Sequence, residues 1–326
     1  MEIENYKKKE FSGLDIFKFI ASIMIVTIHV PPFPHVSYLL LVIDTLAVPF
    51  FAISSSFLLF RKEPDENQIK KFIIRLIILY LFWVIILFPF IFMEKQYFHN
   101  ESIINGIKYF LFDLCFQNVF HGAWFFIWLI YTILIVFALK KIFNSKIILL
   151  ISITIFLYFK FAAINVIPSP YNYIFTLWEQ NIGHYFMGLP YIMVFVSIGM
   201  LLSQYNLQLK RYKNAIFLFF ICFSLMLVSA KILPSYTSIL LIPLVPFILI
   251  ISINLNFQNK ILCKRLRSMS IIIFCSHSTI AYHILNNLDL NNPIRFILTL
   301  LFSISLSEII FWLQKYKYLN WIKYSY

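Results

Sequence analysis

The sequence predicts an all-α bundle of about ten transmembrane helices. Of its 326 residues, 61% are hydrophobic and only 13% are charged, whereas a soluble domain carries roughly 25% charged residues. Ten apolar stretches are long enough to cross a bilayer as helices, which satisfy their own backbone groups in lipid. The Lys and Arg residues gather in alternate connections between these stretches. Together, these observations indicate a polytopic membrane protein.

The ten predicted helices follow one another with no soluble domain, long linker or internal repeat between them. We therefore expect one integral-membrane domain over residues 1–326. The first stretch ends at His29 without a small-residue cleavage site, so we interpret it as a retained anchor rather than a signal peptide. The stretches are 12–30, 39–60, 72–93, 122–139, 147–163, 186–203, 214–231, 237–254, 269–285 and 294–313.

The distribution of basic residues predicts the orientation. With the N-terminus inside, 21 of the 27 Lys and Arg residues fall on the inner side. Basic residues favour the cytoplasmic side, so both termini are expected in the cytoplasm, as an even helix count requires. This bias and anionic lipid headgroups account for the net charge of +13, so the charge predicts no nucleic-acid partner. The richness in Ile, Phe, Lys and Asn is typical of AT-rich bacterial genomes, and we expect a bacterial cell membrane.

One face of the first predicted helix is polar. Lys18 and His29 are eleven residues apart, which places them on the same helix face, about 16 Å apart along the axis. Asp15 and Ser22 fall within about 60° of the line that joins them, and the opposite side carries Ile, Met and Val. We call Asp15, Lys18, Ser22 and His29 the polar face. Polar groups at membrane depth are costly and usually mark a pathway or a reaction site.

The polar face offers a base and a cation. An imidazole titrates near neutral pH, so His29 can take a proton from a hydroxyl or attack an acyl donor as a nucleophile. Either role needs a group that orients the ring, and Asp44, early in the second helix at a similar depth, is the candidate. Structural alternatives remain open: His29 can bond a backbone carbonyl at a helix end, Asp44 can cap its helix, and Lys18 can snorkel to the interface.

Three further candidates are charged. Arg75 lies one turn into the third helix near Lys71, where the two side chains either bind an anion or serve as ordinary positive-inside charge. Glu308, in the inner third of the tenth helix, would be expensive without a partner, and we expect it to neutralise Lys18 or Arg75.

The remaining histidines and the cysteines give weaker signals. His277, in the ninth helix beside two serines, is either a site residue or a histidine that packs between helices. We interpret His121 and His184 as surface-loop histidines. The cysteines form no CxxC pair and no HExxH motif occurs, so we expect no metal.

Five segments carry motifs in a fixed order. GLDIFKFIASIMIVTIH has a basic residue, Lys18, ten residues before a histidine, and VPFFAISSSFLLF has a proline, aromatics and then serines, over residues 48–60. KKFIIRLIILYLFW begins with the basic pair Lys71 and Arg75. Next come AWFFIWLI from Ala123 and SMSIIIFCSH, which ends at His277. In this order, the motifs resemble those of the acyltransferase family 3 membrane proteins over nearly the whole chain.

The sequence departs from the family pattern at three positions. Lys18 stands where the family more often has arginine, Ser55 or Ser56 replaces a glycine, and Phe274 replaces a tyrosine. Each motif is short, so the resemblance depends on their shared order.

The resemblance implies an acyltransferase domain over residues 1–326 in the lipid bilayer. It implies transfer of an acyl group from cytoplasmic acetyl-CoA, or another short acyl-CoA, to a hydroxyl of a cell-surface glycan or lipid-linked glycan precursor. Cations at the inner face suit the phosphates of CoA, and a deeper base suits the thioester. We therefore assign Lys18, Lys71 and Arg75 to the donor, and His29 with Asp44 to catalysis.

Two other functions fit a helix bundle with a polar face. One is a polysaccharide exporter or flippase, and the other is a non-catalytic subunit of a glycan-synthesis complex. A transporter would favour Gly- or Pro-interrupted helices in paired halves, and the prolines here show no such pairing. This favours the enzyme.

Overall fold

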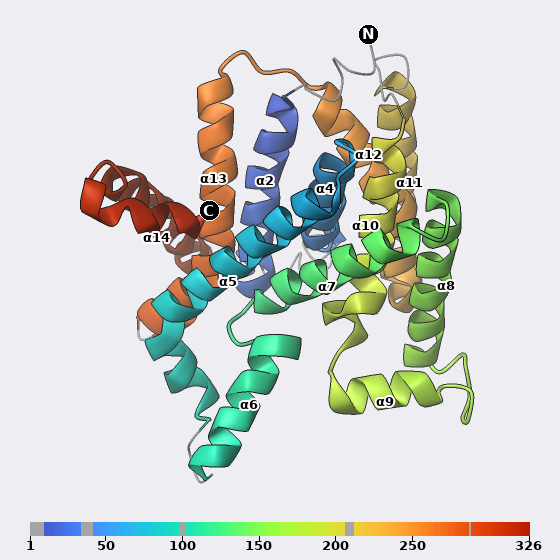
Figure 1. The fold of residues 1–326 in the computed structure, drawn as a ribbon, viewed down its shortest axis with the longest axis horizontal. Coiled ribbons are helices and arrows are strands. Elements are labelled where there is room, and N and C mark those ends of the chain that lie inside the picture. The colour runs from blue at the N-terminus through green and yellow to red at the C-terminus, as the bar shows by residue number, and fades with distance from the viewer. Residues whose placement is uncertain (1–9, 34–41, 98–101, 206–211, 287) are drawn as a thin grey trace.

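The chain folds into a bundle of α-helices, with no strand among the residues that the structure describes. The structure is a computed structural model and describes residues 10–33, 42–97, 102–205, 212–286 and 288–326. The longer helices in Figure 1 are α2 (Ser12–His29), α4 (Ala47–Phe60), α5 (Glu66–Lys95), α6 (Ile103–Phe116), α7 (Ala123–Lys140), α8 (Ser145–Ala163), α9 (Tyr173–Asn181), α10 (Leu189–Ser203), α11 (Tyr212–Ile232), α12 (Leu241–Asn254), α13 (Lys260–Thr279) and α14 (Asn292–Leu313).

Each of the ten predicted stretches corresponds to a helix. Within the described ranges, eight helical segments are long and apolar enough to cross a membrane. The other two predicted stretches correspond to α10, which has 15 residues, and α13, whose first half is basic. The predicted all-α polytopic membrane bundle is confirmed, whereas ten crossings and cytoplasmic termini stay predictions. Residues 39–41 of the second predicted stretch lie outside the described residues.

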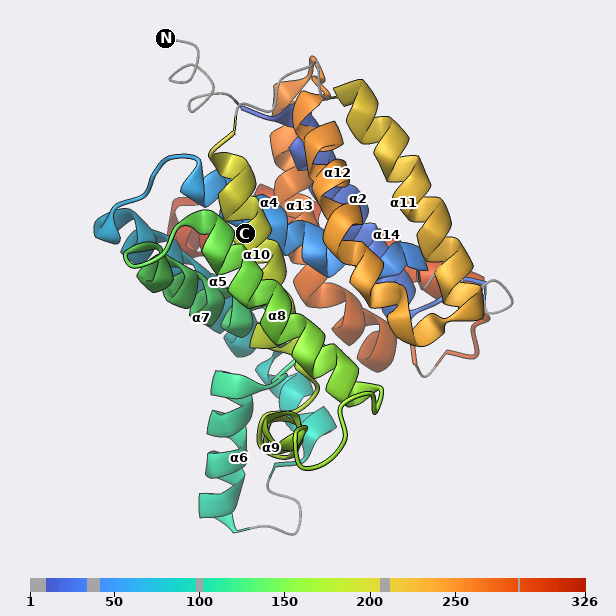
Figure 2. The same cartoon turned by 90° about the vertical axis from the view of Figure 1, so that its right-hand side faces the viewer.

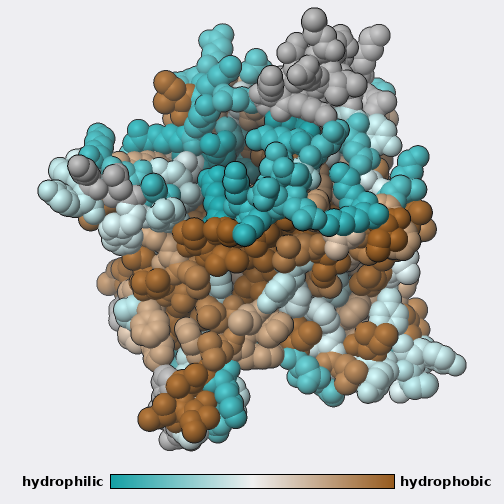
Figure 3. Space-filling view, viewed as in Figure 1, coloured by the Kyte–Doolittle hydropathy of each residue, from teal (hydrophilic) through white to brown (hydrophobic). Residues whose placement is uncertain are grey.

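Two helices, α6 and α9, lie in connections where we predicted none. Both are found at the opposite end of the molecule from the start of α2 (Figures 1 and 2). Figure 3 shows a band of hydrophobic residues across the middle of the molecule, with hydrophilic residues gathered above it. This banding is the pattern of a surface that faces lipid in the middle and water at its ends.

Side-chain caps explain where several helices begin. Asp65 accepts a hydrogen bond from the backbone N–H of Gln68 at 2.7 Å, and Asn144 accepts one from Ile147 at 3.0 Å. Asn291 caps α14 in the same way at 3.1 Å. Such caps satisfy backbone donors that the first turn of a helix leaves unpaired.

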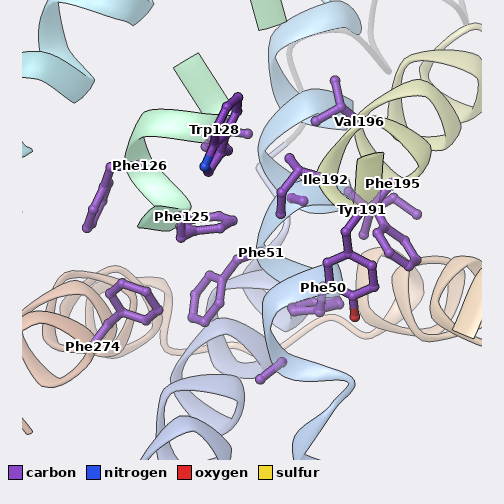
Figure 4. Packing of buried hydrophobic residues seen from close by; sticks show 14 of the residues in the cluster. Phe50, Phe51, Phe125, Phe126, Trp128, Tyr191, Ile192, Phe195, Val196 and Phe274 are labelled. Atoms are coloured by element: carbon purple, nitrogen blue, oxygen red, sulfur yellow. The ribbon is translucent and has the colours of Figure 1, made fainter. Parts of the chain in front are cut away.

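The core depends on close helix contacts and on aromatic rings. A Cβ atom on Gly199 of α10 would lie 2.0 Å from Ser56 Oγ of α4, so only small residues fit where these helices cross. Phe274 of α13 packs against both Phe125 and Phe126 of α7, with ring centroids 5.8 and 5.6 Å away (Figure 4). This aromatic contact holds α13 against the start of α7.

Candidate active site

A single helix carries both ends of the polar face. α2 runs without interruption from Ser12 to His29, so Lys18 and His29 lie on one continuous helix. It ends as the backbone N–H of Val30 donates to the carbonyl of Val26 at 2.8 Å. α2 packs along α13 and α4, so its polar face is covered by other helices rather than by lipid alone.

Three imidazole rings meet at the end of α2. The ring centroid of His29 lies 5.0 Å from that of His277 in α13 and 5.4 Å from that of His121, just before α7. Tyr282 lies in the π-helical turn after α13, and its ring centroid is 5.4 Å from that of His121. Its hydroxyl donates to the carbonyl of His29 at 3.0 Å. We call His29, His121, His277 and Tyr282 the histidine cluster.

The hydrogen bonds of His277 fix one of its nitrogens as a donor. Nδ1 lies 2.9 Å from the carbonyl oxygen of Phe274 and 3.1 Å from that of Ile273, so it carries the hydrogen. In the neutral ring, Nε2 is then an acceptor. This atom is buried and has no partner in the part of the chain that the structure describes. A buried acceptor without a partner is costly, so the site favours a donor beside it.

Gly122 places His121 in the cluster. Its φ of +92° lies in the left-handed region, where side chains other than glycine are strained. A Cβ atom there would also lie 3.1 Å from the ring of Phe274. The backbone can therefore turn sharply before α7, against α13, and bring His121 to the end of α2.

Glu94, near the end of α5, joins the cluster to a fourth histidine. Its Oε1 lies 3.4 Å from Nδ1 of His121, and its Oε2 lies 3.4 Å from Nε2 of His283. Burial lowers the pKa of His121 below its ordinary value of 6.5, and the Glu94 carboxylate opposes this shift. His121 is thus neutral at pH 7 and can accept or donate a hydrogen bond.

Asp44 lies near the cluster but binds another residue. Its carboxylate accepts a hydrogen bond from the hydroxyl of Thr27, two residues before His29 on α2. Among the described residues, no hydrogen bond joins Asp44 to His29, so the assignment of Asp44 as the group that orients His29 stays a prediction. Asp44 is buried, so losing Thr27 would leave it without this partner.

The other end of the polar face is rich in charge. The Lys18 ammonium interacts electrostatically with Arg267, Asp15 and Arg75. Asp15 forms a salt bridge with Arg267 at 3.3 Å, but Lys18 has no salt bridge or hydrogen bond to a described residue. The positive charges of Lys18, Arg75 and Arg267 therefore exceed the one carboxylate between them. Lys71 is exposed one turn before Arg75 on α5.

Glu308 does not neutralise this end. It forms a salt bridge with Arg265 of α13 and pairs with neither Lys18 nor Arg75 within the described ranges. The prediction was wrong because Arg265 on the neighbouring helix, not the polar face of α2, presents its cation to α14. This leaves the cations around Lys18 available for an anion.

Sequence reasoning found part of the cluster. His29 and His277 were candidates, but His121 was interpreted as a surface-loop histidine and is instead packed against His29. Glu94 and Tyr282 were not singled out. The left-handed Gly122 beside His121 is the one local signal of a sharp turn there. The exposed His184 does lie on the surface, where it pairs with Glu179 at 3.1 Å.

No three or more His, Cys, Asp or Glu residues of the described chain form a group that could hold a metal ion.

Comparisons with known proteins place the chain in a family. Two relatives from Enterococcus faecalis, each named amino-acid racemase, are 25% identical over 296 residues and 29% identical over 126 residues. The matches cover 83% and 36% of this chain, but only 41% and 17% of the relatives. The chain therefore spans about two fifths of the length of the first relative. No solved structure matches it. Residues 11–312 match the family described as "Acyltransferase domain", so the chain belongs to acyltransferase family 3, and its long apolar helices are those of a multi-pass membrane protein.

Proposed function

We propose that this protein moves a short acyl group, acetyl by default, from cytoplasmic acyl-CoA to a hydroxyl of a cell-surface glycan or a lipid-linked glycan precursor. One observation carries this proposal: α2 has three imidazoles at one end and an excess of positive charge around Lys18 at the other. The family supports acyl transfer. The donor, the acceptor and the roles below are our inference.

The cationic end suits the donor. CoA is a polyanion with phosphates at one end and its thiol at the end of a long arm. Lys18, Lys71 and Arg75 would hold the phosphates, because an excess of positive charge in a partly buried site attracts a polyanion. Arg267 adds a fourth cation, although its salt bridge with Asp15 neutralises part of its charge. The arm would then reach toward the histidine cluster, about 16 Å along α2.

The histidine cluster suits the proton transfer. His29 takes the proton of the acceptor hydroxyl while the oxygen of that hydroxyl attacks the thioester carbonyl carbon. The carbon–sulfur bond then breaks, and the imidazolium returns its proton to the leaving thiolate. His277 supports this role because its Nε2 is an acceptor beside His29. If one nitrogen of His29 donates to it, the other is left as the base.

Tyr282 and the neighbours of the histidine cluster hold its residues in position. Tyr282 holds the last carbonyl of α2, and Asp44 holds Thr27 two residues earlier, so both fix the end of the helix that carries His29. Glu94 orients His121 and His283 and offers acceptor oxygens to a polyhydroxyl ligand. An imidazole acts as a base only when its ring is held within reach of the proton that it removes. These contacts would keep the ring of His29 in that position.

The name of the two relatives, amino-acid racemase, does not extend this proposal. The longer match spans 41% of the relative, so most of that protein has no counterpart in this sequence. We therefore assign no racemase activity to the chain.

Mass spectrometry of surface glycans tests the proposal. Cells that lack the protein should lose an ester-linked acyl group from a glycan, and the wild-type gene should restore it. The His29→Ala protein should accumulate in the membrane without restoring the ester. An unchanged set of ester groups in cells lacking the protein would overturn the proposed acceptor class.

A further inference from the structure

A second charged site lies away from the histidine cluster. A cavity of about 480 Å³ opens where the first half of α13 meets the end of α14. The side chains that line it include three cations, Lys264, Arg265 and Lys315, and one acidic group, Glu308. We call this cavity the α13–α14 pocket.

The lining contains a donor without an acceptor. The amide oxygen of Gln314 accepts a hydrogen bond from the hydroxyl of Tyr326 at 2.6 Å, which fixes the amide. Its Nε2 is buried and has no partner in the part of the chain that the structure describes. Leaving a buried donor unpaired is costly, so the pocket favours a ligand with acceptor oxygens.

Two of the three cations are held in place. Arg265 forms a salt bridge with Glu308, and its guanidinium lies over the ring of Phe311, 5.4 Å from the centroid. Glu308 contacts Nε and Nη2, which leaves Nη1 of the guanidinium free to donate elsewhere. Lys264 pairs with Glu10 at 2.8 Å. Lys315 is exposed and has no ion pair within the described ranges, so it supplies the charge that is not already neutralised.

The pocket is separate from the cations around Lys18. Arg265 and Arg267 are two residues apart on α13, so their side chains point about 160° apart around the helix. Arg267 pairs with Asp15 of α2, whereas Arg265 pairs with Glu308 of α14. One side of α13 therefore faces the polar face of α2, and the other side lines the pocket. The two sites therefore draw their charge from opposite sides of α13.

Apolar side chains flank the pocket on its outer side. Trp312, which lines it, and Ile309, one turn earlier on α14, are both about half exposed. On α13, Ile261 is 84% exposed, one turn before the lining residues. Exposed apolar side chains on helices of this kind face hydrocarbon, and a tryptophan favours the boundary between hydrocarbon and headgroups. A ligand held here would meet polar donors and lipid at the same time.

We propose that the α13–α14 pocket binds the headgroup of an anionic glycerophospholipid. The phosphate would accept hydrogen bonds from Lys315, from Nη1 of Arg265 and from Nε2 of Gln314, and the acyl chains would lie along the exposed side of α14. Basic pockets between transmembrane helices are suited to such headgroups. This inference concerns a site outside the proposed acyl transfer and does not depend on it.

Quenching of Trp312 fluorescence tests the proposal. The purified protein is placed in nanodiscs of phosphatidylcholine that contain a small fraction of brominated phosphatidylglycerol or, in a parallel sample, brominated phosphatidylcholine. Bromine quenches only nearby tryptophans, and the difference between wild type and Trp312→Phe isolates the signal of Trp312. The wild type should favour the brominated phosphatidylglycerol by about fivefold for each unneutralised cation.

Two variants and one control decide the outcome. Lys315→Gln and Gln314→Leu should each reduce the preference for phosphatidylglycerol, the former by about fivefold. Lys62→Gln removes an exposed cation from the loop between α4 and α5 and should leave the preference unchanged. Equal preferences in all three variants would overturn the proposal. Relief of the quenching by free CoA would also overturn it, because the pocket would then belong to a soluble nucleotide.

Discussion

The imidazole of His277 lies 5.0 Å from that of His29, and its Nδ1 hydrogen is already taken by backbone carbonyls of its own helix. The ring can therefore interact with His29 only as an acceptor while it is neutral. Two residues that are far apart in the sequence thus meet at the end of α2. The proposed role of His29 as a base depends on this arrangement.

Replacing His277 with phenylalanine should reduce acyl transfer but preserve the fold. The ring volume is kept and a buried acceptor without a partner is removed, so the melting temperature should stay constant or rise. The rate should fall by about 10²-fold, the lower range for losing a proton-transfer contact. Turnover of acetyl-CoA and thermal unfolding in detergent measure both effects. His184→Phe, at an exposed position, is the control, and equal rates for the two variants would contradict the role of His277.

Asp44 should act through Thr27. Thr27→Val and Asp44→Leu each remove the hydrogen bond between these buried side chains, so their effects on unfolding should not add. A double-mutant cycle should give a coupling free energy of about 1–3 kcal/mol. Thr27→Ser keeps the hydroxyl and should behave as wild type. Additive losses would mean that Asp44 contacts His29 or the substrate independently of Thr27.

Lys18 and Arg75 should set the affinity for the donor. Lys18→Ala and Arg75→Ala should each weaken acetyl-CoA binding. Lys18→Arg should largely retain binding, because position 18 needs a positive charge at the end of a long side chain. Calorimetric titration of the purified variants measures this, with Lys62→Ala as the control for loss of an unrelated cation. If both alanine variants bound acetyl-CoA as tightly as wild type, these cations would serve topology alone.

His121 should make stability depend on pH. Burial lowers its pKa below 6.5, so the unfolded chain binds a proton at mildly acidic pH that the folded chain does not bind. The free energy that neutral His121 contributes to stability is therefore present above pH 6.5, and it is lost as the pH falls below 6.5. In His121→Gln, the fall in melting temperature from about pH 7.5 to about pH 5.5 should be smaller than in wild type. An identical fall in both proteins would show that His121 does not contribute.

The helices were predictable because their signal is local. A bilayer demands long apolar runs, so composition alone indicated the membrane helices, whereas α6 and α9 in the connections were not predicted. The polar face of α2 was also predictable, since Lys18 and His29 belong to one helix and helical spacing fixes their relation. The first half of α13 is basic, so its hydrophobicity did not indicate the full length of the helix, but its apolar second half was predicted.

The contacts between helices were not predictable in the same way. The positions of His121 and Glu94 depend on how the ends of α5 and α7 turn toward α2. The spacing of apolar residues within a helix does not predict such contacts between helices. Asp44 was assigned to His29 from depth alone, and depth does not tell which residue of the last turn it meets. Thr27 lies two residues before His29, and its hydroxyl donates the hydrogen bond to Asp44. Glu308 was assigned to the wrong cations for the same reason.

The most direct test of the central claim is acyl transfer by His29→Ala. The variant should reach the membrane, retain acetyl-CoA binding through Lys18 and Arg75, and transfer the acyl group at a rate lower by about 10²–10⁴-fold. Single-turnover assays with labelled acetyl-CoA separate binding from transfer, and His184→Ala serves as the matched histidine control. A His29→Ala protein that binds acetyl-CoA and transfers its acyl group at the wild-type rate would contradict the account.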